Sequence, residues 1–177
     1  MRSSTHRSLG LIVSAWALNL LPAFADANQA CRFVGAFGYV YNGTSFASAG
    51  PVPLTETGVI TVDPGGNFTG EGTLAFQFSN FGGSGPLWLL LREVQSNGVV
   101  TPDSNNECSG TVNFVATGTV VKSSNSALVP EGVVLFNNTQ RSIAYTISGP
   151  KNDIVDVIST SQGTIASGTA HRQDKYK

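Results

Sequence analysis

One stretch of the chain, NFTGEGTLAFQF at residues 67–78, alternates strictly between two kinds of residue. Phe68, Leu74, Phe76 and Phe78 share one face with two glycines, and the other face carries mainly Asn, Thr, Glu and Gln. Because the side chains of a β-strand point alternately to opposite faces, this pattern predicts a half-buried strand. Glycines on the apolar face indicate a sharp bend or the close approach of another backbone.

Strand signals recur along the rest of the chain, and no convincing helical periodicity interrupts them. Turn residues separate the runs, which lie at 33–41, 57–63, 67–78, 85–94, 108–121, 132–138, 140–148, 153–160 and 163–172. We expect a polar loop at 97–107 and a tight hairpin around Asn137 and Asn138. The pattern predicts an all-β fold, a single antiparallel up-and-down barrel of about eight strands, with a β-sandwich as the alternative. A barrel is favoured because a chain with only 12% charged residues has few means of protecting exposed strand edges.

The stretch GPLWLLLREV at 85–94 is too apolar for a strand with one wet face. Either Leu87, Leu89 and Leu91 or Trp88 and Leu90 are expected to face the interior. One of the two charged residues that follow should point inward as well. The outer face then needs a cover, which a loop, the segment near Cys31 or a second copy of the chain could supply. We favour a homo-oligomer through residues 87–91, since exposed apolar patches mark contact sites.

The N-terminal residues resemble a secretory signal peptide, with Arg2 and Arg7, an apolar run at 9–21 and an Ala-Phe-Ala pattern ending at Ala25. We therefore expect a signal peptide at 1–27, a barrel domain at 28–172 and a frayed tail at 173–177, with a retained anchor as the alternative. The mature protein is expected to be secreted or periplasmic. After cleavage, no further apolar segment is long enough to span a membrane as a helix.

The two cysteines, Cys31 and Cys108, both lie in the predicted mature chain. Export to an oxidising compartment favours a disulfide between them over free thiols or a metal pair. We expect no metal and no cofactor, because the mature chain offers too few ligands. Nucleic acid is not an expected partner, since the charge is nearly balanced, with ten Lys and Arg against eleven Asp and Glu.

Familiar catalytic arrangements are missing from the sequence. His171, the one histidine of the predicted mature chain, is expected at a solvated strand end, and no G-x-S-x-G motif occurs. Asp156 lies between isoleucines on one strand face, and an inward position would mark a site, although an outward one is favoured. The candidates for lining an internal pocket are Tyr39, Phe76, Trp88, Arg92, Tyr145 and Asp156.

The segments FGYVYNG, GVITVDPGGNFTG, NECSGT and SGTAHRQ resemble a group of secreted bacterial proteins without assigned function. These proteins are similar to small calycin-like barrels, including the allene-oxide-cyclase-like ones. The resemblance implies a small secreted barrel. One departure is Val100, which stands where the pattern has an aromatic residue before the Asp/Glu-Cys pair.

These observations give a main functional hypothesis and two rivals. The main one is a barrel that binds a small apolar ligand or acts through its surface, without being an enzyme. The first rival is a cofactor-free cyclase or isomerase that holds a reactive substrate in the barrel. The second is a structural or surface interaction protein with a filled core. An outer-membrane barrel is disfavoured, because one face of most strands carries Thr, Asn, Gln and Ser.

Overall fold

The computed structural model describes residues 31–47, 50–149 and 151–173. The predicted signal peptide and residues 174–177 of the predicted tail lie outside the described residues. Gln173, the first residue of that tail, donates its backbone N–H to the carbonyl of Ala36 at 2.8 Å.

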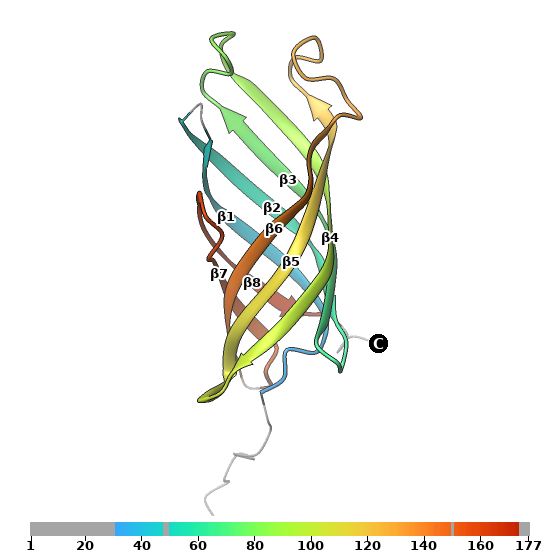
Figure 1. Cartoon of the computed structure of the whole chain (residues 1–177), viewed down its shortest axis with the longest axis vertical. Helices are drawn as coiled ribbons and strands as arrows, with labels where there is room; N and C mark the ends of the chain where they lie inside the picture. The colour runs from blue at the N-terminus through green and yellow to red at the C-terminus, as the bar shows by residue number, and fades with distance from the viewer. Residues whose placement is uncertain (1–30, 48–49, 150, 174–177) are drawn as a thin grey trace, which may run out of the picture.

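Eight antiparallel strands form a closed barrel in which each strand pairs with its neighbours in sequence and the last pairs with the first (Figure 1). The strands are β1 Gly35–Ala47, β2 Gly50–Val62, β3 Asn67–Phe78, β4 Leu87–Asp103, β5 Asn106–Ser123, β6 Val134–Ser148, β7 Ile154–Ser159 and β8 Thr164–Arg172. The predicted all-β up-and-down barrel is confirmed, and the sandwich alternative is wrong. Closure removes the sheet edges that a sparsely charged chain could not protect.

Two local predictions are wrong. Residues 97–107 do not form a polar loop, because most of them continue β4 and begin β5. Asn137 and Asn138 do not turn the chain either. They lie within β6, where Asn138 has a φ of 49° and the pairing with β5 shifts register. Asparagine tolerates this left-handed backbone conformation in a bulge as well as in a hairpin turn, so the residue type alone did not distinguish the two.

The β2–β3 hairpin shows the turn that the sequence predicts. The carboxylate of Asp63 accepts hydrogen bonds from the backbone N–H of Gly65 at 2.8 Å and of Asn67 at 2.9 Å. The side-chain amide of Asn67, which donates to Oδ2 of Asp63 at 2.7 Å, and these backbone bonds favour the ionised form and hold the pKa of Asp63 below its ordinary value. Asp63 therefore has a role in the turn, as expected for Asp before Pro-Gly.

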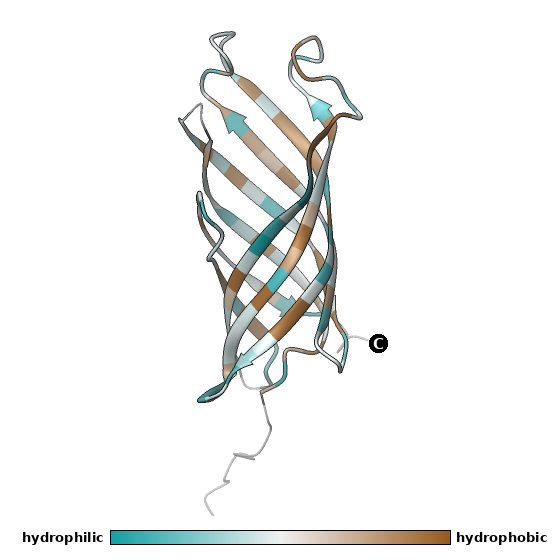
Figure 2. Ribbon diagram, viewed as in Figure 1, coloured by the Kyte–Doolittle hydropathy of each residue, from teal (hydrophilic) through white to brown (hydrophobic). Residues whose placement is uncertain are grey.

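Apolar side chains form two clusters in the interior. Along the strands, hydrophobic and hydrophilic residues alternate (Figure 2). The end near the β4–β5 turn holds an aromatic cluster that includes Phe33, Phe37, Phe68, Phe114 and Tyr145. The opposite end holds a leucine-rich cluster that includes Leu54, Leu74, Leu87, Leu89 and Leu91. Tyr41 and Phe136 pack against both clusters. These two rings therefore mark the middle of the barrel interior, where the two clusters meet.

A disulfide joins Cys31 to Cys108, as predicted, and indicates an oxidising compartment outside the cytoplasm. The bond ties the segment before β1 to the start of β5. Two residues after Cys31, Phe33 is buried against Phe37 and Tyr145, with ring centroids 5.1 and 5.0 Å apart. The disulfide therefore holds an aromatic side chain over this end of the barrel interior.

The apolar stretch in β4 divides between the two faces of the barrel wall. Leu87, Leu89 and Leu91 are fully buried inside, which is one of the two predicted arrangements. Trp88 lies on the outer face and is 49% exposed. With Pro53, Ala75 and Leu90 it lines a surface groove of about 200 Å³. Within the described part of the chain no loop buries Trp88, so the predicted cover by a second copy stays a prediction.

Candidate functional site

A row of inward-facing residues runs from strand to strand along the inner face of the barrel, between the two apolar clusters. Tyr39 of β1 pairs with Gly58 of β2, and Gly58 pairs with Gly72 of β3. Gly72 pairs with Glu93 of β4, which in turn pairs with Gly118 of β5. A Cβ atom on Gly72 would lie 2.4 Å from Oη of Tyr39 and 3.2 Å from Oε1 of Glu56. The glycines therefore leave room for larger polar side chains from neighbouring strands.

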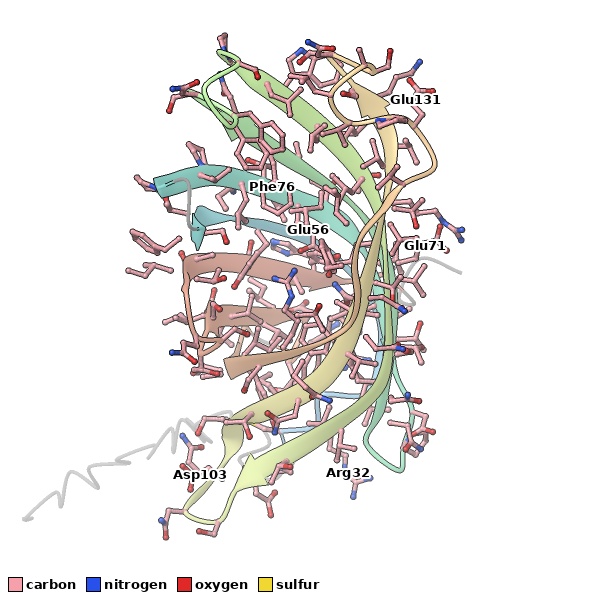
Figure 3. All side chains as sticks on the ribbon, turned by 45° about the horizontal axis from the view of Figure 1, so that its top comes forward. Arg32, Glu56, Glu71, Phe76, Asp103 and Glu131 are labelled. Atoms are coloured by element: carbon pink, nitrogen blue, oxygen red, sulfur yellow. A yellow bond between two sulfur atoms is a disulfide. The ribbon has the colours of Figure 1, made fainter. Side chains whose placement is uncertain are left out.

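Those polar side chains form a hydrogen-bonded network inside the barrel. The Tyr39 hydroxyl donates to Oε1 of Glu56. Nε2 of Gln95 lies 2.9 Å from the same Glu56 oxygen, 3.1 Å from the Tyr39 hydroxyl and 3.2 Å from Oε1 of Glu93. Figure 3 shows Glu56 in the interior and Glu71 on the outer surface. The amide of Gln95 thus links two carboxyl groups from different strands.

Arg141 of β6 supplies the positive charge of this layer. Its Nη2 lies 3.7 Å from Oε2 of Glu93, and its guanidinium carbon lies 5.0 Å from the centre of the Phe136 ring. The ring of Phe136 in turn occupies the space beside Gly118. Arginine is suited to such a position because its planar cation can stack on an aromatic face while it faces a carboxylate. We call Tyr39, Glu56, Glu93, Gln95 and Arg141 the polar layer.

The two carboxyl groups of the polar layer have raised pKa values. Burial, followed by the nearby charge of Glu93, raises the pKa of Glu56 to about 7. Burial also raises the pKa of Glu93, while Arg141 lowers it. Two carboxyls that are this close in a poorly solvated interior hold a proton more readily than either would in water. Burial likewise raises the pKa of Tyr39, so its hydroxyl remains a donor.

The network leaves three buried polar atoms without a hydrogen-bond partner among the described residues: Oε2 of Glu93, Oε1 of Gln95 and Nε of Arg141. Glu93 and Gln95 are only 1% and 5% exposed. Native proteins pair most of their buried polar groups, so these three atoms need an explanation. They provide two acceptors and one donor in neighbouring side chains.

All three side chains line a cavity of about 50 Å³. The rest of the cavity wall is mainly apolar and aromatic, and it comprises Tyr39, Tyr41, Ile60, Phe68, Phe114, Ile143, Val157, Ser159, Ser161 and Ala170. The Arg141 side chain is 20% exposed, so the cavity is close to solvent on this side. Apolar walls with a few convergent polar groups are typical of small-molecule sites.

The predicted pocket residues fall into three groups. Tyr39 lines the cavity. Tyr145 is buried in the aromatic cluster, and Phe76 packs against the leucine-rich cluster, so both are internal without lining the cavity. Trp88, Arg92 and Asp156 are exposed and do not line it. Asp156 points outward, as favoured, and the outward Trp88 and Arg92 each match one of the two arrangements expected for β4. A pocket role for these three residues is therefore not proposed further.

The outward charges have ordinary partners. Arg92 forms an exposed ion pair with Glu71, with Nε 2.6 Å from Oε1. Asp156 accepts a hydrogen bond from the hydroxyl of Ser148 at 3.2 Å. His171 is exposed at the end of β8, as expected. None of these three residues lines the cavity beside the polar layer.

Sequence reasoning missed most of the polar layer, although the alternation contained a signal for it. In β2, Glu56 lies two residues after Leu54 and therefore points to the same, inner face. In β4, Glu93 and Gln95 follow Leu91 by two and four residues and also point inward. A carboxylate on the apolar face of an alternating strand predicts an inward charge. The glycines at 70 and 72 were noted, but they make room for polar side chains rather than for another backbone alone.

Three further observations describe the chain as a whole. Among the described residues, no group of three or more His, Cys, Asp and Glu side chains could hold a metal ion. In the same part of the chain, no helix is long and apolar enough to cross a membrane. Comparisons with known protein families, curated protein sequences and solved structures found no match.

Proposed function

We propose that this barrel is a secreted or periplasmic protein that binds a small molecule, the polar end of which enters the internal cavity. The observation that carries the proposal is the cavity beside the polar layer, with its unpaired buried atoms at Glu93, Gln95 and Arg141. A buried polar atom without a partner is costly, and a ligand that pairs with it recovers that cost on binding. The closed barrel of eight strands supports the same conclusion, since a barrel of this size is about wide enough to hold one small ligand.

The size of the cavity limits what can enter. An apolar cavity of roughly 150 Å³ is known to hold benzene, and this one measures about 50 Å³. Only a group of a few heavy atoms therefore fits without movement of the wall. The remaining, apolar part of a larger ligand would extend past Ser159 and Ser161, which line the cavity beside the largely exposed turn between β7 and β8.

A pair of matched variants tests the proposal. Ala170 is buried and lines the cavity, whereas its neighbour Thr169 is exposed on the outer face of β8. We expect propionamide, a probe with five heavy atoms, to shift the amide resonances of Ile143, Val157 and Ala170 in a two-dimensional NMR titration. Ala170→Phe should abolish these shifts by filling the space, and Thr169→Phe should leave them unchanged. Shifts that spread over the outer surface, or none at all, would contradict the proposal.

The buried carboxyl pair supports a second candidate, a cofactor-free isomerase that moves a proton. Glu93 lines the cavity, and the raised pKa of Glu56 behind it is close to neutral pH, where a general acid or base works best. A test is the exchange of α-hydrogens of butan-2-one for deuterium in D₂O, followed by NMR. Acceleration that is lost in Glu93→Gln would support catalysis, and an unchanged rate of exchange would leave simple binding. Failure of both would favour the third candidate, a surface interaction protein.

A further inference from the structure

The three unpaired atoms of the polar layer indicate the chemistry of the group that enters the cavity. Two of them are acceptors, the Glu93 carboxyl oxygen and the Gln95 amide oxygen. The third is a donor, the Nε–H of Arg141. All belong to side chains that line the same cavity, so one group with two donors and one acceptor could satisfy them together.

A primary carboxamide has this pattern, with two N–H donors and a carbonyl acceptor. An alcohol can donate only one hydrogen bond at a time, and an ammonium group has donors but no acceptor. A carboxylate has acceptors only, and it would meet Oε2 of Glu93 and Oε1 of Gln95 without a hydrogen atom to share. The hydrogen-bonding inventory alone therefore ranks the amide first.

The charges of the polar layer also favour a neutral group. Glu56 and Glu93 come from β2 and β4, Tyr39 from β1 and Arg141 from β6, and Arg141 already faces Glu93 at 3.7 Å. An anion in the cavity would lie beside the carboxyl group of Glu93, and a cation would lie beside the guanidinium of Arg141. Either charge would have to give up its hydration in a mainly apolar cavity.

We propose that the cavity selects a small neutral group of the carboxamide type, attached to an apolar body, over carboxylates, ammonium ions and alcohols of the same size. This inference rests on the proposed function, since it specifies which group occupies that same cavity. The carboxamide N–H groups would donate to Glu93 and Gln95, and its carbonyl would accept from Arg141.

Four probes of nearly equal size test this inference on the unchanged protein. Propionamide, propan-1-ol, propylamine and propionate are titrated separately at pH 7, and each dissociation constant is obtained from the NMR shifts of Ile143, Val157 and Ala170. We expect propionamide to bind about tenfold more tightly than propionate and propylamine, with propan-1-ol between them. Equal or tighter binding of any of the other three would overturn the inference while the proposed function stands. If none of the four binds, the proposed function fails and the inference fails with it.

Two variants locate the preference. Gln95→Met removes the acceptor while it keeps the length of the side chain, and it should reduce the preference for propionamide over propan-1-ol at least threefold. Glu71→Gln changes an exposed carboxyl of the outer surface and should leave all four dissociation constants unchanged. An unchanged preference in a folded Gln95→Met protein, or an equal loss in Glu71→Gln, would overturn the assignment of the amide to the polar layer.

Discussion

Oε2 of Glu93 lies 3.7 Å from Nη2 of Arg141, with the Glu93 side chain 2% exposed and that of Arg141 20% exposed. This separation is that of an ion pair rather than a hydrogen bond. The two charges therefore compensate each other across the interior, while Oε2 of Glu93 and Nε of Arg141 stay without a hydrogen-bond partner among the described residues. The ion pair balances two buried charges, and the same two side chains still have one acceptor and one donor for a ligand.

Removal of one member of this pair should destabilise the barrel. Arg141→Met keeps the bulk of the side chain but leaves Glu93 buried without its cation. We predict a loss of roughly 2–4 kcal/mol in the free energy of unfolding at pH 7, measured by urea denaturation. The double variant with Glu93→Gln should lose less than the sum of the two single variants. Additive losses would show that the two charges do not interact, and Arg92→Met on the outer surface serves as the control.

The stability of the barrel should depend on pH through Glu56. Its pKa rises from an ordinary 4.5 in the unfolded chain to about 7 in the folded protein, so the folded state binds more protons between these values. Stability should therefore be higher near pH 4.5 and decrease as the pH rises to about 7, by on the order of 3 kcal/mol from this group. The comparison is with Glu56→Gln, which cannot ionise. Parallel stability curves for the two proteins between pH 5 and 8 would contradict the shift.

The inward glycines should resist substitution even by alanine. A Cβ atom at Gly72 would lie 2.4 Å from the Tyr39 hydroxyl and 2.9 Å from the Thr57 carbonyl oxygen. We predict that Gly72→Ala lowers the free energy of unfolding by about 1–3 kcal/mol. Tyr39→Phe, which removes the hydroxyl, should relieve part of this loss when the two are combined. Thr73→Ala, on the exposed outer face, is the matched control, and an equal effect there would rule out crowding as the cause.

The alternation of apolar and polar residues predicted most of the fold, because it directly reflects which face of a strand is buried. The β3 strand at 67–78 was predicted with its observed bounds. The extension of β4 and β5 through residues 97–107 was missed, since Asn, Asp and Pro favour loops locally while pairing between two long strands overrides that preference. The Asn137–Asn138 pair was misread for a similar reason.

The site was less predictable than the fold. Its residues come from four strands, and the strand pairing that brings Tyr39, Glu56, Glu93 and Arg141 together follows from register, which the sequence does not state. The sequence does indicate that Glu56 and Glu93 point inward, because each lies an even number of positions from the inward apolar residues of its strand. The inward position of Tyr39 was predicted. The outward direction of Arg92 follows once Glu93 is placed inward, since successive side chains point to opposite faces.

The exposed apolar residues on the outer face of β4 lead to a separate prediction about the oligomeric state. Trp88 keeps about half of its surface exposed, beside Leu90, Ala75 and Pro53 around the surface groove. If a second copy covers this face, light scattering coupled to size-exclusion chromatography should give the mass of a dimer for the unchanged protein. Trp88→Asp should then give a monomer, whereas Ile165→Asp, at another exposed apolar position, should not. A monomer at all concentrations for the unchanged protein would contradict a homo-oligomer through residues 87–91.

Reduction of the disulfide should destabilise the barrel at the end covered by Phe33. The bond joins residues 77 positions apart, and loss of such a bond costs about 2–5 kcal/mol in a small domain. We predict a lower midpoint of thermal unfolding with reductant than without it, and a similarly low midpoint for the Cys31→Ser/Cys108→Ser protein in either condition. An unchanged midpoint in reductant, with both thiols shown to be free, would contradict a stabilising role.

The central claim is that the polar layer and its cavity form a binding site for one small polar group. A crystal structure of the protein grown with propionamide tests this claim most directly. We predict electron density for the amide inside the barrel, within hydrogen-bonding distance of Glu93, Gln95 and Arg141. A cavity filled by rearranged side chains, or propionamide bound only on the outer surface, would contradict it.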